Sequence, residues 1–271
     1  MCLPAGVLTL PANELPTRGR THGFAPTDYV PCFNLIVNKE FKVIIVDLQE
    51  SIAIVRNRIV AAAAKSGRTA SDIMLVAVSK TVDSDTVRRA YELGITDFGE
   101  NRVQEFNRKI EELSQARWHL IGRLQTNKAK DVVGRAALIH SLDRWNLAEE
   151  LNKRGLQQGV EVSCLLQVNI AGEEQKAGIE PDEVNSFLES LGQLEALRID
   201  GLMTMAPLLK EGEKARPVFK ELYHIKEKMS KNRYNNVNLR YLSMGMSQDY
   251  EVAIEEGANI VRVGSAIFHP E

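Results

Sequence analysis

A lysine that follows a short apolar run is the first residue of this sequence with clear chemical potential. Lys80 comes after Leu75–Val78, so it is predicted to leave a buried strand and point toward the mouth of a sheet or barrel. Desolvation at such a place favours the neutral amine, which is the nucleophile that forms a Schiff base. A solvated or ion-paired lysine at a strand end is the alternative that position alone leaves open.

Two later segments are rich in small and hydroxyl-bearing residues. They contain Ser243, Gly245, Met246 and Ser247, and then Gly264 and Ser265. In α/β barrels, the loops after strands seven and eight often bind phosphate through backbone N–H groups. Ser247 also fits the N-cap of a helix predicted over Gln248–Glu256, and the two roles are compatible. Together with Lys80, these segments indicate a ligand that carries a phosphate and an aldehyde.

Eight short apolar runs alternate with amphipathic segments after the first 46 residues. The runs are Ile73–Val78, Asp97–Gly99, Trp118–Ile121, Leu138–Ser141, Cys164–Ile170, Ile199–Met205, Leu239–Met244 and Asn259–Val263. Strands that alternate with helices indicate a parallel sheet, and eight such strands close a barrel. We therefore expect a single (β/α)8 TIM-type barrel over residues 47–271. An open doubly wound sheet is the alternative, but it favours a glycine-rich turn where this sequence has Ser79-Lys80-Thr81.

The first 46 residues differ from the rest of the sequence. Five of the nine prolines fall there, and no helical period is visible. We expect a poorly ordered N-terminal extension, with a tethering arm as the alternative, although Asn34–Val46 is apolar enough for a strand or hairpin. Asp47 is predicted to cap the first barrel helix, with Glu50 completing a capping box and Gly67 ending the helix.

The overall composition excludes several classes of protein. The 271 residues are 44% hydrophobic and 26% charged with a net charge of −2, so no basic excess points to nucleic acid. No apolar run approaches the roughly 18 residues of a membrane span, and the N-terminus lacks the order of a signal peptide. The three cysteines, Cys2, Cys32 and Cys164, are too far apart for a zinc site. We expect a cytoplasmic monomer without a metal or a membrane partner, and a place for Cys164 in the core.

Five motifs occur in the order of one known family. They are Ala77–Thr81 (AVSKT), Phe98–Asn101 (FGEN), Trp118–Gly122 (WHLIG), Leu242–Ser247 (LSMGMS) and Val261–Phe268 (VRVGSAIF). From about Asp47 to Phe268 the sequence resembles the pyridoxal 5'-phosphate (PLP) homeostasis family, also called the YggS or PROSC type. Its members are single barrels similar to the N-terminal domain of alanine racemase. The first 46 residues match nothing in the family pattern.

The resemblance implies roles for individual residues. Lys80 matches the lysine that holds PLP as an imine, Arg262 matches the arginine beside the pyridine nitrogen, and Asn101 matches a residue near the cofactor. The phosphate contacts of the family match the Ser243–Ser247 loop and Gly264-Ser265. Ser265 stands where many relatives have threonine, and the hydroxyl is kept.

Three functions are consistent with these residues. The first, which we expect, is a carrier that holds PLP and supplies it to apo-enzymes without substantial catalysis, so no residue is assigned a catalytic role. The second is a PLP-dependent racemase or decarboxylase. Related racemases carry a second, all-β domain with a catalytic tyrosine, and we expect none here because the sequence ends at Glu271. The third is a Schiff-base aldolase without PLP, which would not need Arg262.

The remaining candidates carry weaker signals. The five histidines are His22, His119, His140, His224 and His269. Their spacing does not suggest a metal site, and His119 is expected to be a hydrogen-bonded barrel residue. Three basic residues after the third strand are expected to form a solvated helix face: Lys128, Lys130 and Arg135. Lys176 follows the fifth strand, where a solvated loop lysine is expected and a transient contact with PLP is the alternative.

Overall fold

The computed structural model describes residues 34–37, 43–172, 177–207 and 211–270. The chain divides into two compact units, residues 1–31 and 32–271, and everything described here belongs to the second. The expectations for the first 33 residues and for Lys176 therefore lie outside the described residues. Within residues 34–46, which are apolar enough for a strand or hairpin, β1 (Asn34–Val37) and β2 (Val43–Val46) pair in antiparallel fashion.

Eight parallel strands form a closed barrel in the order β10-β3-β4-β5-β6-β7-β8-β9. The strands are β3 (Met74–Val78), β4 (Asp97–Glu100), β5 (Arg117–Leu120), β6 (Leu138–Leu142), β7 (Val162–Gln167), β8 (Leu197–Met203), β9 (Val237–Ser243) and β10 (Ile260–Val263). The last strand closes onto the first, with Val261 opposite Leu75 and Val263 opposite Ala77. The prediction of a (β/α)8 barrel is confirmed, and each predicted apolar run overlaps one strand.

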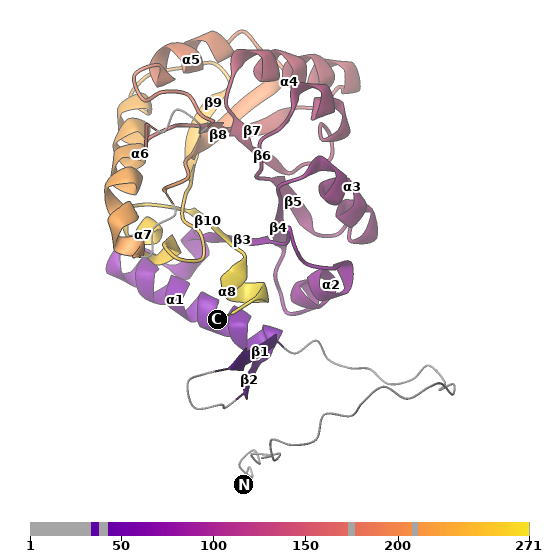
Figure 1. Cartoon of the computed structure of the whole chain (residues 1–271). Coiled ribbons are helices and arrows are strands. Elements are labelled where there is room, and N and C mark those ends of the chain that lie inside the picture. The colour runs from indigo at the N-terminus through magenta and orange to yellow at the C-terminus, as the bar shows by residue number, and fades with distance from the viewer. Residues whose placement is uncertain (1–33, 38–42, 173–176, 208–210, 271) are drawn as a thin grey trace. The chain divides into compact units, whose positions relative to one another are not determined.

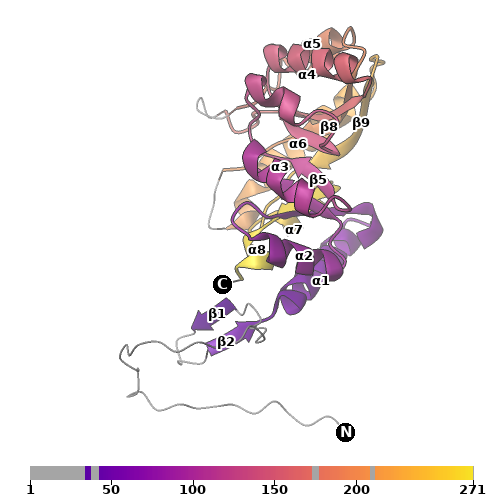
Figure 2. The same cartoon turned by 90° about the vertical axis from the view of Figure 1, so that its right-hand side faces the viewer.

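Helices surround the strands on the outside of the barrel (Figure 1), and the side view in Figure 2 shows the same arrangement. The α-helices are α1 (Leu48–Lys65), α2 (Ser84–Glu92), α3 (Val103–Glu112), α4 (Trp145–Gln158), α5 (Val184–Leu191), α6 (Arg216–Met229), α7 (Tyr250–Glu255) and α8 (Ser265–Phe268). The 3-10 helices are η1 (Ala70–Asp72), η2 (Thr126–Asp131) and η3 (Gly212–Ala215). Between β5 and β6 the connection is η2, so Lys128 and Lys130 of the predicted basic helix face belong to a 3-10 helix and Arg135 lies in the turn after it.

The core has two separate apolar clusters. The larger one packs strands against helices and includes Phe98 and Trp118, whose ring centroids lie 5.3 Å apart. The smaller one contains Val76, Leu138, Leu165, Met203 and Ile260, all nearly inaccessible, from five different strands. Alternation along each strand explains the division, because neighbouring side chains face the helices and the barrel interior in turn. Cys164 is buried in the larger cluster as predicted, and burial raises the pKa of its thiol.

Two predicted helix starts need correction. Asp47 is the N-cap of α1, but its carboxylate makes no capping bond and lies 3.8 Å from the guanidinium of Arg89, so the predicted capping box is absent. The helix predicted from Gln248 begins at Tyr250, with Asp249 rather than Ser247 at its N-cap. At the other end of α1, Gly67 has a φ of +69°, which is why a glycine can end this helix.

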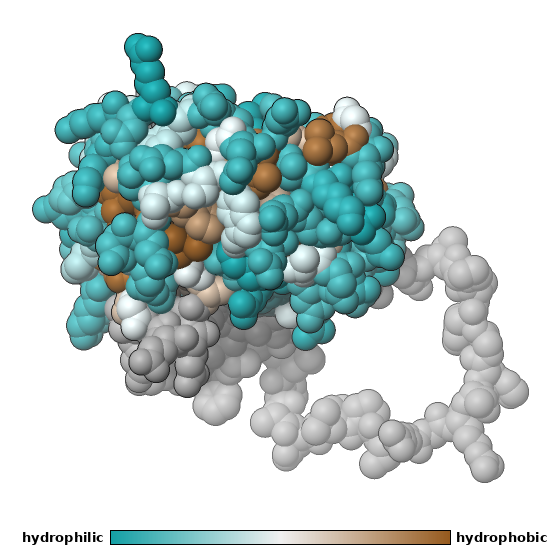
Figure 3. Space-filling model, turned by 90° about the horizontal axis from the view of Figure 1, so that it is seen from above, coloured by the Kyte–Doolittle hydropathy of each residue, from teal (hydrophilic) through white to brown (hydrophobic). Residues whose placement is uncertain are grey.

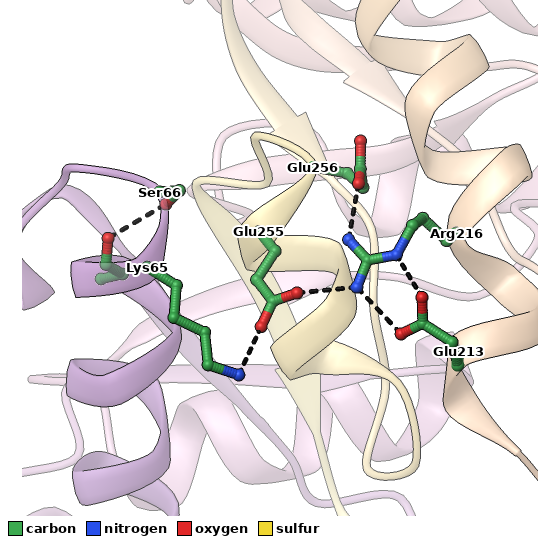
Figure 4. A network of polar contacts seen from close by, with 7 residues as sticks. Lys65, Ser66, Glu213, Arg216, Glu255 and Glu256 are labelled. Carbon is green, nitrogen blue, oxygen red and sulfur yellow. Dashed lines mark hydrogen bonds and ion pairs between the residues drawn. The ribbon is translucent and has the colours of Figure 1, made fainter.

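A polar network joins the helices that meet where the barrel closes (Figure 4). Arg216, the first residue of α6, donates to Glu255, the last residue of α7, at 2.7 Å and to Glu256, the C-cap of α7, at 2.6 Å, and also pairs with Glu213. Lys65 at the end of α1 contacts the same Glu255 at 2.8 Å. The carboxylates raise the pKa of Arg216, and Lys65 and Arg216 lower that of Glu255. Such partly exposed pairs fix orientation more than they add stability.

The face of the molecule seen in Figure 3 is mostly polar. In the space-filling view of Figure 3, hydrophilic residues cover most of the visible face, and hydrophobic residues form small separate groups. Among the described residues, no helix is long and apolar enough to cross a membrane.

Candidate functional site

A cavity of about 520 Å³ lies at the carboxyl ends of the strands, where barrels place their functional groups. Seven of the nine residues selected by the sequence motifs line it: Lys80, Asn101, Met246, Ser247, Arg262, Gly264 and Ser265. They come from the ends of β3, β4, β9 and β10, so the closure of the barrel brings distant segments together. Ser243 and Gly245, the other two, are not among the lining residues.

Lys80 stands two residues beyond the end of β3 and its side chain is exposed over the mouth of the cavity. The desolvation that we expected at this lysine is therefore absent, because the side chain extends past the buried part of the strand. Its neighbour Ser79, by contrast, is fully buried, and the Ser79 N–H donates to the carbonyl of Gly99 at 3.0 Å. The base of Lys80 is thus anchored while its amine is free to reach into the cavity.

Directly beneath Lys80 is a buried ion pair that sequence reasoning missed. The Nζ atom of Lys109 on α3 lies 2.6 Å from Oε1 of Glu100 at the end of β4, and the two side chains are 2% and 1% exposed. Lys109 also donates to the carbonyl of Ser79 at 2.6 Å, and the Ser79 hydroxyl donates to Glu100 at 2.7 Å. The only sequence signal was the position of Lys109 on the apolar face of its helix, three residues after Phe106. This pair fixes the backbone from which Lys80 projects.

The loops after β9 and β10 are tied together by Ser247. Its hydroxyl accepts the N–H groups of Gly264 at 3.2 Å and Ala266 at 3.3 Å. Ser265, also on the wall, is exposed, and its N–H belongs to the first turn of α8, where no intrahelical acceptor exists. These hydroxyl and N–H groups form a polar end of the cavity that suits an anion.

Gly245 and Asp249 shape the same end of the cavity. Gly245 has a φ of +92°, and a Cβ atom there would lie 2.6 Å from the Cβ of Ala253, so only glycine lets the loop approach α7. Asp249 lines the cavity and accepts the N–H of Met246 at 2.6 Å. Burial raises the pKa of this carboxyl group. Gly245 therefore allows the loop to pass close to α7. The N–H of Met246 is hydrogen-bonded to Asp249 inside the loop.

Arg262 forms the floor of the cavity and is held by buried partners. One terminal nitrogen donates to the hydroxyl of Ser243 at 2.6 Å, and the other donates to the carbonyl of Thr204 at 2.9 Å. Burial lowers the pKa of the guanidinium to about 10, so it stays charged at neutral pH. Ser243 is completely buried, because its side chain points into the barrel below the cavity rather than toward the loops. Its hydroxyl supports Arg262.

A chain of hydrogen bonds continues from Ser243 across the barrel interior. The hydroxyl lies 2.9 Å from Nδ1 of His140, Nε2 of His140 lies 3.0 Å from Nδ1 of His119, and Nε2 of His119 lies 2.9 Å from Asp97. Both imidazoles are fully buried. The prediction that His119 is a hydrogen-bonded barrel residue is confirmed.

The two ends of this chain determine its direction. Arginine only donates and a carboxylate only accepts, so Arg262 donates to Ser243, Ser243 to His140, His140 to His119, and His119 to Asp97. Each histidine then carries its proton on Nε2 and accepts at Nδ1. Burial above all, together with the charge of Arg262, holds the pKa of His140 well below 6.5, which agrees with a neutral ring. Sequence reasoning missed this chain because its members are scattered over five strands.

The residues at this cavity fit a phosphorylated aldehyde such as PLP. Lys80 offers an amine, the Ser247 and Ser265 loops offer anion donors, and Arg262 offers a buried guanidinium. Among the described residues, no group of His, Cys, Asp and Glu has the arrangement of a metal site.

Comparisons with known proteins agree with this geometry. The family model of the alanine racemase N-terminal domain matches residues 53–271. A pyridoxal phosphate homeostasis protein of Aquifex aeolicus is 44% identical over 221 residues, which cover 81% of this chain and 96% of the relative. The chain belongs to the pyridoxal phosphate homeostasis protein family. The member of this family from Escherichia coli K12 is 36% identical over 231 residues, covering 82% of this chain and 96% of the relative.

Solved structures show the same relationship. PipY of Synechococcus elongatus, whose crystal structure contains bound PLP, superposes with a TM-score of 0.71 at 34% identity, covering 82% of this chain and all of that one. An alanine racemase of Clostridium difficile superposes with a TM-score of 0.65 at 14% identity, covering 88% of this chain and 58% of that one. The second likeness concerns the barrel fold alone.

Proposed function

We propose that this member of the family binds PLP as an imine on Lys80 and acts in intracellular PLP homeostasis. The observation that carries the proposal is the single cavity that the Lys80 amine, Ser247, Ser265 and the buried Arg262 line together. The relatives named as PLP homeostasis proteins and the PLP-bound PipY support it. PLP, when bound, supplies a reactive aldehyde and a ring that can withdraw electrons.

Different residues of the site would hold different parts of this ligand. Lys80 would take the aldehyde, and Ser247 and Ser265 would take the phosphate with the N–H groups of their loops. Asn101 lies on the wall near the base of Lys80, where it would contact the ring side of the ligand. Ser243 acts indirectly, since its hydroxyl holds the guanidinium of Arg262. A Cβ atom at Gly264 would lie 3.2 Å from the carbonyl oxygen of Val78, so the lack of a side chain lets the last loop lie close to the end of β3.

The role we propose is that of a carrier without substantial catalysis. Arg262 would face the ring nitrogen as a permanent donor, and this favours the unprotonated ring, which withdraws electrons less strongly. The exposure of Lys80 at the cavity mouth favours release of the aldehyde to an acceptor. We infer that apo-enzymes in the cytoplasm receive PLP from the monomeric protein.

Spectroscopy and turnover assays test the two parts of this proposal. Titration of the full chain with PLP should produce the visible absorbance of a lysine imine, and Lys80→Ala should lose it. Incubation of the PLP-loaded protein with single-enantiomer amino acids should give no sustained racemisation or decarboxylation. An apo-enzyme of known PLP requirement should gain activity when mixed with it. Sustained turnover at ordinary enzyme rates that Lys80→Ala abolishes would contradict the carrier role.

A further inference from the structure

A second cavity, which we call the basic cavity, lies beside the first at the carboxyl ends of the strands. It has a volume of about 700 Å³ and is formed by the loops after β4, β5 and β6. Asn101 and Arg123 line both cavities. A volume in the range of about 300–1,000 Å³ is typical of sites for small molecules. The segment Gln125–Lys128, which follows the third barrel strand, contributes much of its wall.

The wall of the basic cavity carries an excess of positive charge. Its cations are Arg102, Arg123, Lys128 and Arg144, and among the described residues no carboxylate lines it. Two carboxylates balance the cations from outside. Asp143 pairs with Arg123 at 3.1 Å and also with Arg144, and Asp131 lies 3.9 Å from Lys128.

Arg102 stays without an ion-pair partner in the part of the chain that the structure describes. Glu105, the carboxylate one turn further along α3, pairs instead with Arg108 at 2.9 Å. The balance of charge in the basic cavity is therefore positive, and Arg102 is exposed and free to meet a ligand.

Two of these arginines occupy positions that the fold itself does not favour. Arg102 is the N-cap of α3 and Arg144 is the N-cap of α4, helices of 10 and 14 residues, and neither side chain makes a capping bond. N-caps favour Ser, Thr, Asp or Asn, and a cation at a helix N-terminus opposes the helix dipole. A bound anion would offset both costs at once.

The other lining groups define the chemistry of the ligand. Gln104, Gln125 and Asn127 are exposed amides that donate and accept hydrogen bonds, and Thr126 adds a hydroxyl. Among the described residues of the wall, none is aromatic, so a nucleobase would find no ring to stack on. Guanidinium groups and amides match phosphate oxygens in number and geometry. We propose that the basic cavity binds a small, compact phosphorylated molecule, separate from the ligand of the first cavity.

Binding in the two cavities would be coupled. A ligand in the basic cavity contacts Asn101 and Arg123 from one side, and a ligand in the first cavity contacts them from the other. Any effect of one ligand on the affinity of the second is then reciprocal. The basic cavity would let the level of a phosphorylated metabolite adjust how firmly the first cavity holds its ligand.

Calorimetric titration with inorganic pyrophosphate tests the proposal. The full chain saturated with PLP should bind one pyrophosphate, and Arg102→Gln/Lys128→Gln should weaken this binding by at least about tenfold. The matched control is Lys130→Gln/Lys153→Gln, which removes the same charge from exposed lysines outside both cavities. The control should change the affinity by less than about twofold.

A further variant separates the basic cavity from the first one. Ser247→Ala/Ser265→Ala weakens the anion donors of the first cavity, and this variant should still bind pyrophosphate saturably, with an affinity that differs from that of the wild type only by the coupling between the two cavities. The proposal is overturned by three results: no saturable binding to the full chain, equal losses in the two charge variants, or loss of binding in the serine variant. Because the serine variant needs no PLP, failure of the PLP site and failure of the basic cavity give different results.

Discussion

Replacing Lys109 by methionine removes the positive charge from the buried pair beneath Lys80 and keeps most of the aliphatic volume. Nζ of Lys109 lies 2.6 Å from Oε1 of Glu100, and both side chains are at least 98% inaccessible. The variant leaves a buried carboxylate with the Ser79 hydroxyl as its remaining donor. Removing one partner of a buried ion pair costs about 3–5 kcal/mol, so Lys109→Met should lower the free energy of unfolding by this amount.

Two further variants test whether the loss of stability comes from the unpaired buried carboxylate of Glu100. Glu100→Gln/Lys109→Met removes both charges and should recover most of the stability, because replacing both partners of a buried pair is often nearly neutral. Arg108→Met changes the adjacent residue, whose pairs with Glu105 and Glu112 are exposed, and should cost less than about 1 kcal/mol.

Urea denaturation at neutral pH without PLP is the appropriate assay, because bound ligand would add its own stabilisation. Circular dichroism and tryptophan fluorescence would follow the transition, and Trp118 is a buried reporter in the core. A Lys109→Met variant as stable as Arg108→Met would refute the reasoning. So would a double variant that is no more stable than Lys109→Met alone.

Three other predictions address the phosphate end, the histidine chain and the N-terminal extension. Ser247→Ala/Ser265→Ala should weaken PLP more than tenfold in a folded protein, because each hydrogen bond to a charged group is worth about 1.5–3 kcal/mol; fluorescence titration that finds wild-type affinity would contradict this. His140 stays neutral in the folded protein because burial holds its pKa well below 6.5, whereas the unfolded chain binds a proton below that pH. Stability should therefore fall with pH below about 6.5, by about 1.4 kcal/mol per unit for this residue, and His140→Gln should show a shallower fall in urea midpoints between pH 7.5 and 5.5; equal slopes would argue against it. A chain that starts at Asp47 should fold and bind PLP normally, and a melting temperature lower by more than about 4 °C would show that the extension contributes.

The sequence predicts the barrel well because its strands and helices have clear local patterns. Apolar runs such as Ile73–Val78 are short and separated by amphipathic segments, and every one of the eight runs overlaps a strand. The rule that functional groups follow the carboxyl ends of strands then brings Lys80 together with Arg262 and Ser265, which are about 180 residues away. The barrel topology alone therefore predicts that these distant residues meet at one site.

The direction of single side chains is where prediction from sequence fails. Ser243 and Ser247 lie in one motif, yet the first points into the barrel toward Arg262 and the second into the loop. Lys80 is exposed rather than desolvated because it lies past the end of its strand. The role of Lys109 could not be predicted, because the spacing that places it on an apolar helix face does not show that it has a buried partner, Glu100, on β4. These outcomes depend on register and on partners far away in the sequence.

Borohydride reduction of the PLP-loaded protein, followed by peptide mass spectrometry, tests the central claim most directly. Reduction fixes an imine as a stable amine, so the modified residue is identified by its mass. We expect one label per chain, on the tryptic peptide that contains Lys80, and no such label in Lys80→Ala. Full labelling of a different lysine, with the Lys80→Ala variant labelled equally, would contradict it.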